Sequence, residues 1–357
     1  MSEAAVRTAF EQQAGVCRGL DSPFTAQVCD LIAERLDRTT AVGRRVLDWP
    51  GDPRANADAV PLRLCGALHA IARGGTVKAV EAAWPPHETP DADTLWSAIA
   101  GALGQAEGFI LDWLDSPPQT NEVGRSGPLT AGLLVLADRF GLPFELYELG
   151  SSAGLNLNLD RYGFDLGGVE AGDAASAVRL APRWTGAAPP SSVVSVARRQ
   201  GVDLKPLDPV LPETAERLTA FVWADQRKRL ERLEAALEIA RSHPPQVEAG
   251  DAAAWLERVL AAEPAPGRCR VVMHTIAFQY FPPEGQARVR AHLAAVGAQA
   301  TGQAPLAWLQ YEAASAPDAE GRRWAELSLT VWPSGEQRTL ARGHPHGFAL
   351  EWFGEGG

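Results

Sequence analysis

The stretch Phe144-Glu-Leu-Tyr-Glu-Leu-Gly150-Ser-Ser-Ala-Gly154-Leu-Asn156 decides the fold of this 357-residue chain. Its first six residues are largely apolar and β-prone, the next five are small, and a helical pattern follows. This order predicts a strand, a tight turn and a helix start, as in doubly wound sheets that bind nucleotide-like ligands. Glu148 would end the strand, and Gly150 and Gly154 would permit the sharp turn and the close packing of the helix. The free N–H groups of residues 152–155 would face the crevice.

The turn does not match the phosphate-binding pattern G-x-G-x-x-G, because Ser152 occupies the second glycine position. It resembles the first motif of class I S-adenosylmethionine-dependent methyltransferases, E/D-x-G-x-G-x-G, with that single replacement. The resemblance implies S-adenosylmethionine as cofactor. The residues that it implies as cofactor-binding here are Glu148, Gly150, Ser152 and Gly154. An ordinary strand–turn–helix of an α/β protein is the alternative interpretation.

Composition limits the class of protein. Hydrophobic residues make up 46% and charged residues 22%, as in globular proteins. The formal net charge of −11 does not suit a nucleic-acid-binding surface, which needs basic residues. The four cysteines are scattered, the N-terminus lacks a signal-peptide core, and no apolar run is long enough to span a membrane. We therefore expect a cytoplasmic protein with no nucleic-acid or membrane partner.

The N-terminal third predicts helices only. Apolar residues recur at helical spacing through residues 4–115, and Ser22-Pro23 is a typical helix start. We predict an α-helical N-terminal domain or cap over residues 1–126 and an α/β domain over residues 127–357.

A dense polar cluster, Gln119-Thr-Asn-Glu-Val-Gly-Arg-Ser126, separates two helical patterns. It could simply cap the following helix, with Thr120 or Asn121 at the start and Glu122 in the first turn. It could also present Asn121, Glu122 and Arg125 to a small polar substrate. The two interpretations are compatible.

Six segments together resemble one bacterial domain-of-unknown-function family, found largely in actinobacteria and proteobacteria, whose match runs over nearly the whole chain in order. The segments are residues 119–126, 148–156, 223–233, 274–280, 332–335 and 344–347. That family has no established activity. Its core resembles the class I methyltransferase fold, which implies a mostly parallel, Rossmann-like doubly wound sheet.

The second strand of the sheet is predicted farther along the chain than in the simple doubly wound fold. Residues 163–192 are rich in Gly and Pro and look inserted, so we place the second strand at Val193–Val196, followed by Gly201-Val-Asp203. In the methyltransferase pattern, an acidic residue at this point accepts hydrogen bonds from both ribose hydroxyls. Asp203 is accordingly the expected ribose ligand, with a solvated turn residue as the alternative.

Two further acidic residues lie at the ends of predicted elements. Residues 246–249 read as a short third strand, and the resemblance places the Asp251 carboxylate on the adenine amino group. Asp225 precedes a long amphipathic helix and is a natural N-cap. Trp223 and Asp225 are also candidates for the mouth of the crevice, and hence for substrate contact.

The fourth strand, Cys269–Thr275, is a continuous apolar run that carries His274 at its carboxyl end. His274 could act as a general base for an oxygen nucleophile, because its ordinary pKa lies near 6.5. Tyr280 is the second candidate catalytic residue. A structural histidine is the alternative, and the D/N-P-P-Y/F motif of many N-methyltransferases is missing.

The C-terminal segment predicts a fifth strand at Leu306–Tyr311 and then an antiparallel meander over 327–332, 338–342 and 348–352. His344-Pro-His346 reads as a turn, and no metal site is predicted.

The sequence thus predicts methyl transfer from S-adenosylmethionine to a small polar acceptor. A binding or regulatory protein on the same fold, without turnover, is the alternative. A hydrolase with Ser151 or Ser152 as nucleophile is less consistent, because neither G-x-S-x-G nor a triad order is present.

Overall fold

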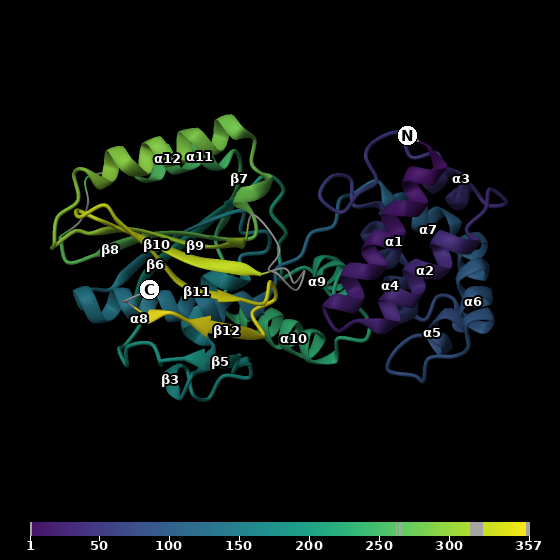
Figure 1. Ribbon diagram of the computed structural model, residues 1–357, viewed down its shortest axis with the longest axis horizontal. Coiled ribbons are helices and arrows are strands. Elements are labelled where there is room, and N and C mark those ends of the chain that lie inside the picture. Colours follow the sequence, from purple (N-terminus) through teal and green to yellow (C-terminus); the bar gives the residue numbers. More distant parts are fainter. Residues whose placement is uncertain (1, 262, 264–265, 315–323, 355–357) are drawn as a thin grey trace. The chain divides into compact units, whose positions relative to one another are not determined.

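The computed structural model describes residues 2–261, 263, 266–314 and 324–354. The chain divides into two compact units (Figure 1). Unit 1 comprises residues 1–120 and 212–231, and unit 2 comprises residues 121–211 and 232–357. The sequence placed the boundary after residue 126 and assigned residues 212–231 to the α/β part, so the division differs from that expectation at both points.

Unit 1 is helical, as predicted for its first 115 residues. The helices that it contains are α1 (Glu3–Gly19), α2 (Pro23–Arg35), α3 (Ala41–Leu47), α4 (Val60–Gly74), α5 (Lys78–Ala83), α6 (Ala92–Gln105), α7 (Glu107–Leu114) and α9 (Pro212–Ala220), and the first five residues of α10 (Arg227–Ser242). Their apolar faces form one buried core that includes Phe221 and Ala224 from the second segment. The late segment therefore belongs to the hydrophobic core of unit 1.

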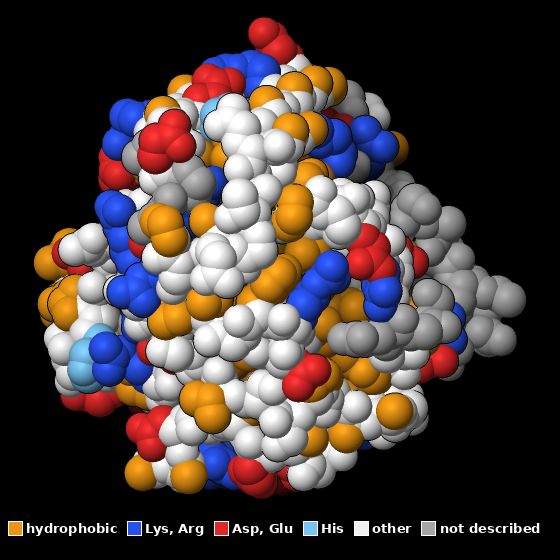
Figure 2. All heavy atoms as spheres, turned by 90° about the vertical axis from the view of Figure 1, so that its left-hand side faces the viewer, with side chains coloured by type: hydrophobic (Ala, Val, Ile, Leu, Met, Phe, Trp, Pro, Cys, Tyr) orange, Lys and Arg blue, Asp and Glu red, His pale blue; other side chains and the backbone are white. Residues whose placement is uncertain are grey.

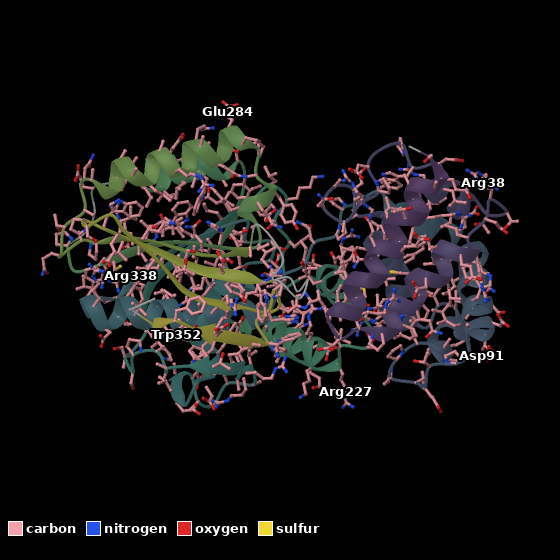
Figure 3. The ribbon with its side chains drawn as sticks, in the orientation of Figure 1. Arg38, Asp91, Arg227, Glu284, Arg338 and Trp352 are labelled. Carbon is pink, nitrogen blue, oxygen red and sulfur yellow. The ribbon has the colours of Figure 1, made fainter. Side chains whose placement is uncertain are left out.

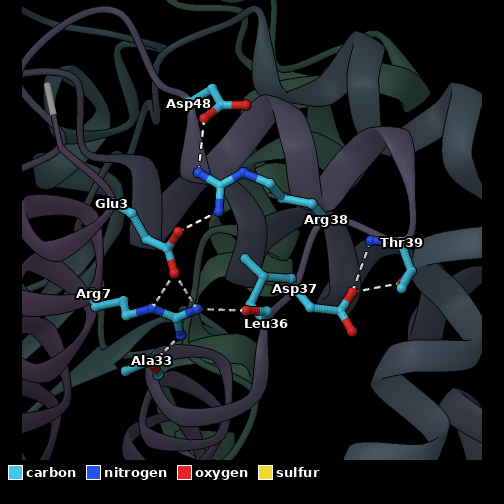
Figure 4. Close-up of polar contacts among 8 residues, drawn as sticks. All are labelled: Glu3, Arg7, Ala33, Leu36, Asp37, Arg38, Thr39 and Asp48. Carbon is cyan, nitrogen blue, oxygen red and sulfur yellow. Dashed lines mark hydrogen bonds and ion pairs between the residues drawn. The ribbon is translucent and has the colours of Figure 1, made fainter.

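An arginine network joins the first three helices of unit 1 (Figure 4). Glu3 of α1 accepts hydrogen bonds from Arg7 and Arg38. The Arg7 guanidinium also donates to the carbonyl oxygens of Ala33 (2.6 Å) and Leu36 (2.7 Å). These contacts satisfy carbonyl groups that the C-terminal end of α2 leaves unpaired.

Unit 2 is an α/β unit built on a nine-stranded sheet with the order β5-β12-β11-β10-β9-β8-β1-β6-β7. The strands in chain order are β1 (Phe144–Leu149), β5 (Arg183–Gly186), β6 (Val196–Asp203), β7 (Val247–Ala249), β8 (Cys269–Thr275), β9 (Leu306–Ala313), β10 (Ala325–Trp332), β11 (Glu336–Gly343) and β12 (Ala349–Trp352). The predicted parallel strands and the C-terminal meander are confirmed. The second strand was misplaced: it was expected at Val193–Val196 but spans Val196–Asp203, so Asp203 is its last residue rather than part of the following segment.

Five adjacent strands of this sheet are parallel, in the order β7-β6-β1-β8-β9. Numbered along the chain, this order is 3-2-1-4-5, so the direction of winding reverses between β1 and β8. Ligands of open α/β sheets bind at such a point, outside the carboxyl ends of the strands. The predicted doubly wound arrangement therefore places the carboxyl end of β1 at the expected binding edge.

Helices cover both faces of the sheet (Figure 1). α11 (Ala252–Val259) and α12 (Pro283–Gly297) lie on one face, where Tyr147 and Leu149 of β1 pack against their apolar side chains. α8 (Ser126–Phe140) lies on the other face. Because side chains alternate along a strand, Glu148 points to the face opposite Tyr147 and Leu149.

The predicted insertion near residues 163–192 forms its own small structure. β2 (Gly163–Leu166), β3 (Val169–Gly172) and β4 (Arg179–Leu180) make a three-stranded sheet, and β5 then pairs with β12 at the edge of the main sheet.

The sequence predicted an α-helix after the turn that follows β1, and this prediction of the helix type is wrong. Residues Leu155–Arg161 form the 3₁₀ helix η2, with non-helical angles at Asn158. All five residues from Leu155 to Leu159 are buried, polar and apolar alike. Because every side of this segment is buried, it lacks the pattern of one buried and one exposed face that is typical of a surface α-helix.

Candidate functional site

The turn after β1 has the strained backbone that the sequence suggested. Gly150 and Gly154 both have φ of +70°, and Ser152, which is not a glycine, has φ of +54°. A Cβ at Gly150 would lie 2.7 Å from the Ala277 Cβ, and one at Gly154 would lie 2.7 Å from Pro245. The two glycines thus permit close packing of neighbouring loops against the turn.

The N–H groups of Ser152, Gly154 and Leu155, which were expected to be free, have partners within the chain. Ser152 N–H donates to Asp203 Oδ2 at 2.9 Å, and Leu155 N–H donates to Asn121 Oδ1 at 2.8 Å. Gly154 N–H donates to the Ser151 carbonyl oxygen. Side chains of this chain therefore occupy amides at which an anionic ligand would otherwise bind.

Glu148 is the buried carboxyl group of the site, with 2% of the residue exposed. Burial raises its pKa to about 8, while a hydrogen bond with Asn156 opposes that rise and the charge of Asp203 adds to it. Its Oε2 atom makes no hydrogen bond within the described part of the chain. A carboxyl group with this pKa is protonated and neutral at pH 7.

A chain of hydrogen bonds connects Glu148 to the start of α8. Ser126 Oγ donates to Asn156 Oδ1 at 2.8 Å, and Asn156 in turn contacts Glu148. Ser126 and Asn156 are almost completely buried. Neither residue was predicted to have a role. The signal in the sequence was a hydroxyl group and an amide group within motifs that flank the acidic residue Glu148.

The polar cluster that precedes α8 lies in unit 2 and contacts the predicted edge. Arg125 donates from Nη1 to the carbonyl oxygen of Thr275 (3.1 Å), the last residue of β8, and from Nε to the Pro345 carbonyl oxygen (2.9 Å). Asn121 reaches the turn after β1 through its contact with Leu155. The cluster therefore fastens the loops after β1 and β8 and the turn before β12.

Glu122 has the predicted capping role and a second contact within unit 2. Its Oε1 accepts from the Gly124 N–H at 3.0 Å, so it caps the short 3₁₀ helix η1 (Val123–Arg125). It also forms an ion pair with Arg232 Nη1 at 3.6 Å, and both side chains are largely buried. Arg232 was not among the predicted site residues, because only the folded chain brings it to Glu122.

Asp203 ends β6 and Asp251 follows β7, and these two strands are neighbours in the sheet. Both carboxylates already serve local structure. Asp203 Oδ1 accepts from Lys205 N–H at 2.9 Å, and Asp251 Oδ1 caps α11 by accepting from Ala254 N–H. Each carboxylate retains further lone pairs that a ligand could use.

His274 occupies the carboxyl end of β8, as predicted, but is completely buried. Trp308 donates its indole N–H to His274 Nε2 at 3.0 Å, and an indole nitrogen can only donate. The proton of the neutral ring must then lie on Nδ1, which donates to Glu312 Oε1 at 2.7 Å. Because both ring nitrogens are engaged, the geometry favours the structural alternative over a general base.

Glu312 fixes the loop after β8 together with His274. Burial would raise its pKa, but the hydrogen bond from His274 and those from the Ala277 and Phe278 N–H groups bring that pKa below its usual value. Tyr280, the second predicted catalytic residue, lies in the 3₁₀ helix η3 (Phe278–Tyr280) and is 60% exposed. Its side chain is accessible near the same edge.

Two predicted substrate residues, Trp223 and Asp225, belong to unit 1. The Asp225 carboxylate accepts from Ser22 Oγ and from Phe24 N–H (2.9 Å), so it caps the start of α2. The Arg229 guanidinium lies over the Trp223 ring. Both side chains thus have local structural roles within unit 1.

The hydrolase alternative gains no support. Ser151 is completely buried and its Oγ donates to the Glu148 carbonyl oxygen at 2.8 Å, which is no arrangement for a nucleophile. His344 and His346 flank the turn before β12, and no group of three or more metal-ligating side chains was found among the described residues. None of the described helices has both the length and the apolarity needed to cross a membrane.

A comparison with curated proteins gives no match. A family model, described as an uncharacterized protein conserved in bacteria (DUF2332), matches residues 7–352. The match includes the polar cluster before α8, the turn after β1 and the loop after β8, and from its extent the chain belongs to this bacterial family.

Proposed function

We propose that the carboxyl edge of β1, β6 and β7 binds S-adenosylmethionine, and that unit 2 transfers its methyl group to a small polar acceptor. The observation that carries this proposal is the position of three acidic residues. Glu148, Asp203 and Asp251 stand at the carboxyl ends of three adjacent parallel strands, beside the point where the winding reverses. This is the edge that doubly wound sheets use for nucleoside ligands.

The chemistry of the turn favours a nucleoside without phosphate groups. Asp203 and Asn121 already hold the N–H groups of Ser152 and Leu155, and the Asp203 carboxylate would repel a nearby phosphate. A ribose instead offers hydroxyl donors, for which a half-buried carboxylate is a good acceptor. The partly exposed Asp203 suits the two ribose hydroxyls better than it suits a pyrophosphate.

Direct methyl transfer demands mainly alignment of the acceptor and exclusion of water. With His274 held by Trp308 and Glu312, Tyr280 is the member of the predicted catalytic pair whose side chain an acceptor could contact. Arg125 and Asn121 would act by holding the surrounding loops. The residues Glu148, Gly150, Ser152, Gly154, Asp203 and Asp251 form the proposed cofactor site.

The second candidate is a protein that binds the same ligand without turnover. It is favoured by one observation, namely that both nitrogens of His274 are engaged, so the most obvious base of the edge is not available. Such a protein would use ligand binding to regulate another activity.

Titration with S-adenosylmethionine and with S-adenosylhomocysteine, up to millimolar concentration, tests the proposal. At a ligand concentration of about 100 times Kd, the fold should gain about 2.7 kcal/mol, seen as a higher melting temperature and as heat in calorimetry. ATP is the matched control and should bind at least tenfold more weakly. If neither adenosyl ligand gives heat or a melting shift, the proposed site is wrong.

Turnover separates the two candidates once binding is found. Release of S-adenosylhomocysteine in the presence of a panel of small hydroxy, amino and carboxylic acids supports the transferase. Binding without release across that panel supports the regulatory protein.

A further inference from the structure

A second concave site lies at the far end of α8 from the proposed cofactor site. It has a volume of about 300 Å³ and lies between the C-terminal end of α8 and the hairpin of β10 and β11. The residues that line it are Val135, Asp138, Arg139, Leu329, Val331, Glu336, Arg338 and Leu340. Along α8, Arg139 is about 20 Å from Ser126 at a rise of 1.5 Å per residue, so the two sites are separate.

The floor of this cavity is apolar. Val135 faces it from the helix, and Leu329, Val331 and Leu340 face it from alternate positions of the two strands. All four are at most 5% exposed. Such a floor can bury the apolar part of a small ligand but offers it no hydrogen-bonding groups.

The rim of the cavity is charged and balanced. Arg139 Nη1 lies 3.1 Å from Glu336 Oε2, and Arg338 forms a second ion pair with the same carboxylate. These two arginines lower the pKa of Glu336, so it remains ionised. Asp138 adds a second negative charge, and its Oδ1 accepts from Ser192 Oγ at 3.2 Å. The rim therefore holds two positive and two negative side chains.

Figure 3 labels Arg338 on the left of unit 2, and Figure 2 views the molecule from that side. Hydrophobic side chains are exposed there between basic and acidic ones (Figure 2). The side chains of Arg139, Glu336 and Arg338 are 40%, 32% and 37% exposed, respectively. They are accessible enough to rearrange around a ligand at modest cost, because exposed ion pairs contribute little to stability.

We propose that this cavity binds a small zwitterion with an apolar body, of the chemical class of the aliphatic and aromatic α-amino acids. The carboxylate of the ligand pairs with the guanidinium groups of Arg139 and Arg338, which suit bidentate recognition. Its ammonium group pairs with Asp138 and Glu336, and its side chain covers the apolar floor. A ligand with one charge would leave the opposite charges of the rim without a new partner, whereas a zwitterion compensates both.

The experiment compares leucine and phenylalanine with fragments that each lack one feature. The probes are 4-methylpentanoate without the ammonium group, 3-methylbutylamine without the carboxylate, and glycine without the apolar body. Calorimetry or ligand-observed NMR on the full chain should show binding of leucine or phenylalanine, with each fragment at least about tenfold weaker. If neither amino acid binds at 10 mM, or if one fragment binds as tightly as leucine, the proposal is overturned.

Variants locate the binding in the cavity. Arg139→Gln and Arg338→Gln should each weaken amino-acid binding about tenfold. Arg179→Gln is the matched control, since Arg179 forms a similar exposed ion pair with Glu170 in the small sheet. Equal affinity in all three variants, with unchanged circular dichroism, would place the binding elsewhere. The same variants are also titrated with S-adenosylmethionine. Because the two sites are separate, its affinity should not change in these variants, so this proposal can fail without the proposed function failing.

Discussion

The carboxylate of Asp203 accepts the backbone N–H of Ser152 at 2.9 Å, so the last residue of β6 holds the turn that follows β1. Its second oxygen accepts the N–H of Lys205. Ser152 has φ of +54°, a conformation that is costly for a residue other than glycine and needs support from its surroundings. Asp203 thus supports the conformation of the turn and is also the residue that we propose to bind the ribose hydroxyls.

Replacement of Asp203 should have two measurable effects. Asp203→Ala removes hydrogen bonds to a charged acceptor and should lower the free energy of unfolding by about 1.5–3 kcal/mol in urea titrations. It should also weaken S-adenosylmethionine binding by a similar amount. Asp208→Ala is the control, because Asp208 is exposed and its side chain accepts a local hydrogen bond from Val210 N–H two residues on. Loss of stability with unchanged affinity would leave Asp203 a purely structural residue.

Glu148 should make the stability of unit 2 depend on pH. Its pKa is about 8 in the folded chain and near 4.5 in the unfolded chain, so the folded state binds the proton more tightly. The stabilisation is therefore complete below pH 4.5 and is lost as pH rises from about 4.5 to 8, by up to about 1.4 kcal/mol per pH unit.

Glu148→Gln keeps a neutral side chain of the same shape at every pH and should remove this dependence. We expect the unfolding free energy of the variant, relative to that of the unmodified chain, to increase from pH 5.5 through 6.5 to 7.5. Glu145→Gln on the same strand serves as the control. A constant difference between Glu148→Gln and the unmodified chain across these pH values would contradict the assigned protonation state.

His274 should behave as a fixed structural group. Long-range ¹H–¹⁵N NMR should find the proton of its ring on Nδ1, since Nε2 accepts from Trp308. His274→Gln should cost about 2 kcal/mol or more in unfolding free energy, because Glu312 or Trp308 loses its partner inside the fold. His243→Gln, at an exposed position, should have little effect. A ring protonated on Nε2 would contradict the hydrogen bond from Trp308 and with it the assigned structural role.

Much of the fold could be predicted because it depends on local patterns. The apolar run of β8 and the turn residues around β10, β11 and β12 mark strands wherever they occur. The helices of residues 4–115 follow from apolar spacing alone. Glu148 could be placed at a strand end for the same reason, whereas Asp203 was expected in the segment after the second strand and instead ends it.

The rest depends on contacts between distant residues. The residues around Leu155 in the sequence do not indicate that Asn121 will accept its N–H. Those around His274 do not indicate that Trp308 and Glu312 will hydrogen-bond to its ring. The 3₁₀ conformation of η2 likewise arises from burial on all sides. Phe221 shows the same limit, because its contact with Trp113 in unit 1 joins segments more than one hundred residues apart.

The discontinuous unit 1 has a consequence for synthesis. Helices α1 to α7 leave the ribosome first, but Phe221 and Ala224 of their core are made only after β1 and β6. At typical rates of elongation, the residues from 121 to 231 take on the order of ten seconds to add. During that interval the growing helical bundle must leave uncovered the apolar surface around Trp113 and Gly66, against which Phe221 later packs.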